Sequence, residues 1–208
     1  MFDLIFKGGP VMAPIILGSI FGLAIIVEKF WELRSLKMDS FKFIQEVFHC
    51  LKANRIQMAM DLCEENIRYP VAAVFKIGIE RRYMAPQRLE KILEQVGNNQ
   101  IQRLERYLSA LASIIGIEPL LGFLGTITGL IQAFMTWEKA GANITVNALA
   151  AGIYQAMITT AAGLLVAIPF YLCYNYFVSR IKYVANELTN HSVQLVELIT
   201  EMKEGSGT

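Results

Sequence analysis

The segment Glu118-Pro119-Leu120-Leu121-Gly122-Phe123-Leu124-Gly125-Thr126-Ile127-Thr128-Gly129 decides how this chain folds. It lies in an apolar run long enough to cross a bilayer, yet it combines glycine, threonine, proline and one carboxylate. A helix that faces lipid gains nothing from such residues, whereas a helix that packs closely against others around a polar path does. The segment therefore predicts a membrane helix with a polar, protein-facing side.

The composition of the whole chain is that of a membrane protein. Of its 208 residues, 54% are hydrophobic and 18% are charged. Three stretches approach the roughly 20 residues that a bilayer requires, and we expect transmembrane helices at 11–31, 109–137 and 148–178. The first begins after a single basic residue, Lys7, balanced by Asp3, and has no small-residue cleavage site, so we expect it to be retained. The fold class predicted is an all-α membrane protein with three spans.

The distribution of positive charge predicts the orientation of these spans. Seventeen of the nineteen Lys and Arg residues lie at 29–108 or 179–208, and only Lys7 and Lys139 lie elsewhere. Because basic residues are retained on the cytoplasmic side, we expect a short external N-terminus at 1–10 and a periplasmic loop at 138–147. The same rule predicts a cytoplasmic domain at 32–108 and a cytoplasmic tail at 179–208.

Apolar residues at helical spacing predict that both cytoplasmic parts form one helical bundle. We expect helices to begin at Pro70 and Pro86, because proline is favoured in the first turn. No breaker follows Leu104, so we expect one helix to run from the cytoplasm into the second span. The tail should continue the third span and end in disorder at 205–208. Its apolar seam consists of Ile181, Val184, Leu188, His191, Leu195, Leu198 and Met202.

Two polar stripes mark the second and third spans as a shared site. On helices, steps of three and four align Glu118, Gly122, Gly125, Gly129 and Gln132 in one span, and Gly152, Gln155, Thr159 and Gly163, with Thr160 beside them, in the other. Polar groups in hydrocarbon need partners or water, so we expect this face to line a protein-walled path. The alternative is a close-packed helix seam without a path.

Nothing in the sequence indicates catalysis. It contains no Ser/His/Asp set, no phosphate-binding loop and no cluster of residues with metal-ligand spacing, so we expect no catalytic residue, no metal and no cofactor. The cysteines Cys50, Cys63 and Cys173 match no redox or metal pattern. The net charge of +1 gives no reason to expect nucleic acid as a partner. We therefore expect a membrane protein that is not an enzyme.

The two stripes also resemble the motifs of a known family. Residues 119–129 are similar to the second-span motif of the MotA/TolQ/ExbB proton-channel family, and residues 152–169, followed by Tyr174-Asn175, resemble its third-span motif. The resemblance extends to the three-span topology and the cytoplasmic insertion. With three spans and a short chain, the sequence is more similar to the ExbB/TolQ branch than to the four-span flagellar stators.

The resemblance implies an assembly and roles for several residues. It implies a homopentamer, surrounded by membrane lipids, whose second and third spans line a pore around the single spans of an ExbD/TolR-like dimer. An aspartate of that partner carries the proton, and a TonB- or TolA-like protein receives the work. Thr126 and Thr160 match the pore threonines that hydrogen-bond the aspartate or nearby water. The residues expected to shape and pack the helices and to clear space for the partner are Pro119, Pro169, Gly122, Gly125, Gly129 and Gly163.

Two residues depart from the family pattern. Where many relatives have a glutamate, this chain has Gln155, which orients water but cannot exchange a proton, and we group it with Thr159 in the ion path. Glu118 stands where the family has a small or apolar residue. It lies eight residues from Thr126, about 12 Å along a helix. We expect it to line the inner mouth of the pore, the alternative being an interfacial carboxylate that is solvated or paired with a neighbouring subunit.

The function that these motifs imply is a proton-channel stator subunit that converts proton motive force into work for TonB-dependent-type import. A TolQ-type role in envelope maintenance and a gliding or motility drive are alternatives within the family. A non-conducting membrane scaffold is the alternative of another class. The transported ion expected is H⁺, with Na⁺ as the alternative, because members using either ion share these motifs.

Overall fold

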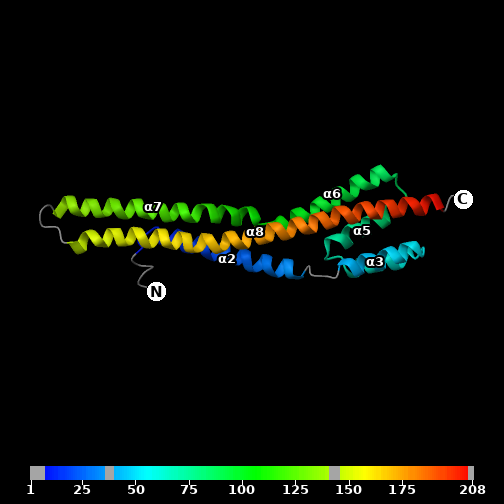
Figure 1. The fold of residues 1–208 in the computed structure, drawn as a ribbon, viewed down its shortest axis with the longest axis horizontal. Helices are drawn as coiled ribbons and strands as arrows, with labels where there is room; N and C mark the ends of the chain where they lie inside the picture. The colour runs from blue at the N-terminus through cyan, green and yellow to red at the C-terminus, as the bar shows by residue number, and fades with distance from the viewer. Residues whose placement is uncertain (1–7, 36–39, 141–145, 206–208) are drawn as a thin grey trace. The chain divides into compact units, whose positions relative to one another are not determined.

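A computed structural model of the chain describes residues 8–35, 40–140 and 146–205, and every regular element within these ranges is an α-helix. In chain order the helices are α2 (Met12–Ser35), α3 (Ser40–Lys52), α4 (Ile56–Glu65), α5 (Pro70–Glu80), α6 (Pro86–Glu105), α7 (Leu108–Ala140) and α8 (Val146–Gly205) (Figure 1). Three helical stretches are long and apolar enough to cross a membrane. The predicted all-α class with three spans is therefore confirmed.

The chain divides into two compact units, and each has its own kind of packing. The membrane unit comprises 8–29 and 107–176, and the bundle unit comprises 30–106 and 177–205. Because α2 and α8 are long, each contributes residues to both units.

In the membrane unit, α7 and the first half of α8 run antiparallel and side by side (Figure 1). α7 continues to Ala140 and α8 begins at Val146, so helix covers both ends of the loop predicted at 138–147, while 141–145 lie outside the described residues. Pro119 and Pro169 lie inside α7 and α8, and both helices continue through them. Because proline has no N–H group, each of them removes one backbone hydrogen bond. Helices bend most readily at such positions.

The bundle unit is held together by large apolar side chains. Its core takes residues from α3, α4, α5, α6 and the second half of α8, and the rings of Phe48 and Phe75 stack with centroids 5.6 Å apart. The predicted seam of the tail is buried at Ile181, Leu188, Leu195 and Leu198. Cys63 is fully buried in this core, and the burial raises the pKa of its thiol to about 12.

The helix boundaries in the bundle unit follow the sequence with one correction. Pro70 and Pro86 stand in the first turns of α5 and α6, as predicted. The prediction of one unbroken helix from Leu104 into the second span is wrong, because α6 ends at Glu105 and α7 begins at Leu108. Between them Tyr107 has a φ of 67°, a left-handed conformation that a right-handed helix cannot contain.

The end of the chain is helical for longer than predicted. α8 runs unbroken from the third span to Gly205, which confirms that the tail continues the span. Gly205 was expected to be disordered and is helical instead, and the rest of that prediction, 206–208, lies outside the described residues.

Candidate functional site

The site is built on a seam between α7 and α8 in which glycines let the two backbones meet. A Cβ placed on Gly129 would lie 2.9 Å from the carbonyl oxygen of Gly152, and one on Gly163 would lie 2.5 Å from that of Glu118. A Cβ on Gly125 would overlap the side chain of Thr159. Such contacts exclude any residue larger than glycine. The space cleared by these glycines is thus occupied by the facing helix of the same chain, which is α8 for Gly125 and Gly129 and α7 for Gly163.

The two threonines predicted to line the pore meet across this seam. The hydroxyls of Thr126 and Thr160 are in hydrogen-bond contact with each other. The Thr160 hydroxyl also lies 3.0 Å from the carbonyl oxygen of Gly122, and the Thr126 hydroxyl lies 3.4 Å from that of Ala156. Both side chains are half-buried, so one side of the pair stays accessible. Each hydroxyl has one proton to donate and two lone pairs, and the pair therefore retains capacity to accept a hydrogen bond from water or a protonated carboxyl.

The seam between α7 and α8 has two sides. Helix α2 lies against the side that carries Glu118 and not against the side that carries Thr126 and Thr160. On α7, Glu118 and Thr126 are eight residues apart, which separates them by roughly 80° around the helix. Glu118 points to α2, where a Cβ on Gly18 would overlap its Oε1 atom. We call this side the α2 flank, and we call the other side, which carries Thr126 and Thr160, the threonine flank.

Two residues of α8 confirm that α2 covers this side. The ring of Phe170 fills the space above Gly22 of α2, and the amide of Gln155 lies against Gly9 in the turn that precedes α2. Gly9 has a φ of 73°, so glycine is favoured there by conformation as well as by space. On the threonine flank, by contrast, Phe123 and Met157 are exposed, at 62% and 66% of their surface.

The five residues predicted for the ion path therefore do not form one group. Thr126 and Thr160 lie together, whereas Gln155 and Glu118 lie on the α2 flank. Thr159 is fully buried beneath Gly125, and its hydroxyl donates to the carbonyl oxygen of Gln155 at 2.6 Å.

The predicted position of Glu118 at the mouth of a pore disagrees with its burial. Only 1% of its surface is exposed in the single chain, and an assembly or a membrane can only reduce that figure. A side chain lining a pore would be exposed in an isolated subunit. The alternative of a solvated interfacial carboxylate fails for the same reason.

Sequence reasoning missed the part that α2 plays in this site. Gly18 and Gly22 are four residues apart, the small-x-x-x-small spacing of close-packed membrane helices, and that signal was present in the sequence. They receive the side chains of Glu118 and Phe170. The prolines of the predicted site stand at its edges, with Pro119 half-buried and Pro169 exposed.

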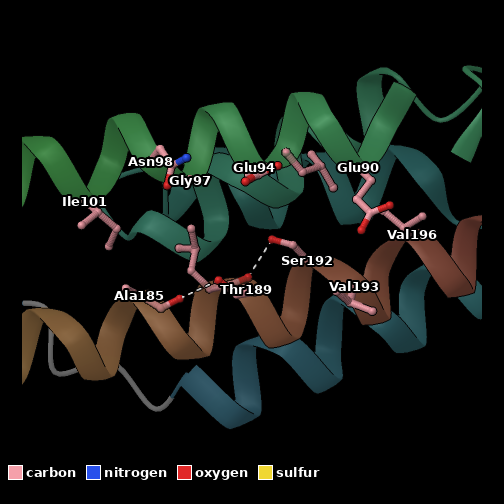
Figure 2. A pocket seen from close by; sticks show the side chains of 12 residues that line it. Glu90, Glu94, Gly97, Asn98, Ile101, Ala185, Thr189, Ser192, Val193 and Val196 are labelled. Carbon is pink, nitrogen blue, oxygen red and sulfur yellow. Dashed lines mark hydrogen bonds between the residues drawn. The ribbon is translucent and has the colours of Figure 1, made fainter. Parts of the chain in front are cut away.

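A groove in the bundle unit lies outside the predicted site. It has a volume of about 340 Å³ between α6 and the second half of α8, and Glu90, Glu94 and Asn98 line one side (Figure 2). On the other side, the hydroxyls of Thr189 and Ser192 donate to carbonyl oxygens of their own helix, at 3.1 and 2.7 Å. These two hydroxyls donate their protons within α8. None of the residues predicted for the functional site lines the groove.

Comparison with known proteins identifies relatives over most of the chain. A sequence model of the MotA/TolQ/ExbB proton channel family matches residues 66–190. A putative biopolymer transport protein ExbB-like 1 from Synechocystis is 30% identical over 181 residues, covering 86% of this chain and 71% of the relative. The Tol-Pal system protein TolQ of Haemophilus influenzae is 34% identical over 93 residues, 45% of this chain and 40% of that protein. The biopolymer transport protein exbB1 of Vibrio cholerae is 53% identical over 60 residues, 28% of this chain and 26% of that protein.

Proposed function

Because the chain belongs to the MotA/TolQ/ExbB proton channel family, in its ExbB/TolQ branch, we propose that it is the stator subunit of a motor that drives TonB-dependent-type import. The family and the three apolar helices make it a multi-pass protein of the bacterial inner membrane. Its general role is that of an ExbB/TolQ-type component that energises transport. What we propose beyond this is the ion path, the partners and the process that the motor serves.

The observation that carries the proposal is the pair of threonine hydroxyls on the flank that α2 leaves accessible. Thr126 and Thr160 are half-buried rather than enclosed, and their hydroxyls contact each other. Their spare lone pairs suit them to accept a hydrogen bond from a protonated carboxyl or a water molecule. They would hold a proton carrier in position without being charged themselves.

The assembly that this arrangement favours is a closed ring with the threonine flank turned inward. In a homopentamer, α7 and α8 would then line the pore, and α2 would lie on the outer side of each subunit. The exposed apolar residues Phe123 and Met157 beside the threonines would contact the single span of an ExbD/TolR-like dimer. The aspartate of that partner would carry H⁺ past the threonine pair. The chain itself would contribute no catalytic group, and the excess of basic residues would keep the bundle unit in the cytoplasm.

The proposal is tested by reconstituting the chain with and without its single-span partner in liposomes. Proton flux under an imposed pH gradient should require the partner, and counting chains in the purified particle should give five copies around two. Flux from this chain alone would overturn the division of labour between the chains. The absence of flux with the partner present would favour the non-conducting scaffold.

The Tol system is the second candidate, because the similarity to the Haemophilus influenzae TolQ exceeds 30% identity over 93 residues. A deletion strain separates the two roles. Failure to grow under iron limitation with normal detergent resistance supports the TonB-type role, and the reverse pattern supports the Tol-type role. A motility defect without either change would point to a gliding drive.

A further inference from the structure

Glu118 is a carboxyl group that the proposed ion path does not use. Its side chain is enclosed between α2 and α7, with 1% of its surface exposed. The Oε2 atom has no hydrogen-bond partner among the described residues, and Oε1 rests above Gly18. An ionised carboxylate that is buried without a partner is among the costliest arrangements in a protein. A protonated one is a small polar group that an apolar seam tolerates.

No charged group faces Glu118 from any of the three helices packed around it. Residues 12–27 of α2 contain no ionisable side chain, and the nearest on that helix are Glu28 and Lys29, ten or more residues beyond Gly18. On α7, Glu118 is the only ionisable residue within 108–137.

The third helix adds no charge either. Gly163 of α8 contacts the backbone of Glu118, and the nearest ionisable residues on α8 are Tyr154 and Tyr171. Both are eight or more residues away, at least about 12 Å along the helix, and both are exposed. Among the side chains of these stretches, Glu118 is the only carboxylate.

We propose that Glu118 is a proton-binding site of this subunit itself, separate from the threonine pair. Each copy of the chain thus holds one proton in the seam between α2 and α7. Loss of that proton would leave a charge in a buried space without a counter-charge. The seam would then have to open, so α2 docks against α7 only while Glu118 is protonated.

Reaction with N,N′-dicyclohexylcarbodiimide tests this directly, since the reagent enters apolar regions and attacks protonated carboxyls. The full chain in detergent micelles at pH 8 is treated, digested and examined by mass spectrometry. Glu118 should be modified at least tenfold more than Glu65, an exposed carboxyl of the bundle unit. A carboxyl group in contact with water is almost entirely ionised at that pH. A water-soluble carbodiimide should show no preference for Glu118.

One control variant and three further outcomes decide whether Glu118 carries a proton. Glu118→Gln should remove the modified peptide while the protein still elutes as a folded particle. Equal modification of Glu118 and Glu65 at pH 8, or none at Glu118, would overturn the proposal. Protection of Glu118 by added sodium chloride but not by choline chloride would also overturn it, because the bound ion would then be Na⁺. The measurement needs neither the partner nor proton flux, so it stands or falls independently of the proposed channel function.

Discussion

The two flanks of the α7–α8 seam carry similar polar residues in opposite surroundings. On the threonine flank, Thr126 and Thr160 keep part of their surface accessible and bond to each other and to backbone carbonyls. On the α2 flank, Glu118 is enclosed, and Gly18 of α2 is shaped to receive it. The threonine pair can therefore form hydrogen bonds with a group that approaches it from outside the chain, whereas the Glu118 carboxyl is closed off from such a group by α2.

A polar residue in a membrane helix is therefore not by itself evidence of an ion path. Glu118 and Thr126 stand on the same helix, two turns apart, and sequence reasoning placed both in the pore. What separates them is an angle of roughly 80° around the helix and the presence of α2 on one side.

The largest expected effect comes from placing a larger side chain in the seam between α7 and α8. Gly125→Val would place methyl groups inside the side chain of Thr159, and we expect loss of the folded membrane unit, at a cost of about 3 kcal/mol or more. Gly116→Val is the matched control on the same helix, because a Cβ there meets no atom within 4 Å. Elution of the two purified variants in detergent measures the difference. If Gly125→Val elutes and unfolds like Gly116→Val, the seam is not packed as described.

The threonine flank should be next in sensitivity. Thr160→Val keeps the shape of the side chain but removes the hydroxyl that contacts Thr126 and Gly122, and we expect proton flux to fall about tenfold or more. Thr136→Val is the control, since that exposed hydroxyl bonds only to Gln132 in its own helix. Both variants should assemble equally well. Unchanged flux in Thr160→Val would remove the threonine pair from the ion path.

Substitutions on the α2 flank should have small effects on stability, and the effects of changing Gly18 and Glu118 should depend on each other. Gly18→Ala places a methyl group against the Glu118 carboxyl, the end of a flexible side chain, and we expect a cost of about 1 kcal/mol. For a chain of this size that lowers the melting temperature in detergent by about 2–4 °C. In a Glu118→Ala background the same substitution should cost nothing, because the overlapping atom is gone. Additive effects of the two substitutions would mean that Glu118 does not rest on Gly18.

The sequence was sufficient to predict the elements that depend on periodicity and on proline. The three spans follow from their apolar length, the starts of α5 and α6 follow from Pro70 and Pro86, and the buried tail follows from its seam. Each of these features depends on residues close together in the chain, so no knowledge of the neighbouring helix was needed.

The features that could not be predicted depend on what lies beside a helix. The helix break at Tyr107 has no glycine or proline beside it, so the neighbouring sequence does not predict its left-handed backbone. The position of Glu118 depends on the side of α7 that α2 occupies, which periodicity in α7 does not contain. Only the spacing of Gly18 and Gly22 hinted at it, since small residues four apart allow another helix to come close.

The accessibility of the threonine pair is tested most directly by comparing two adjacent positions of α8. In a background with Cys50, Cys63 and Cys173 replaced by alanine, Thr160→Cys and Thr159→Cys are each assembled with the single-span partner and treated with a charged, membrane-impermeant thiol reagent. Thr159 is fully buried beneath Gly125 and Thr160 is not. We expect Thr160→Cys to react and proton flux then to fall, while Thr159→Cys stays unmodified. Equal reaction at both positions, or reaction at Thr159→Cys alone, would contradict the accessibility of the threonine pair beside a closed seam.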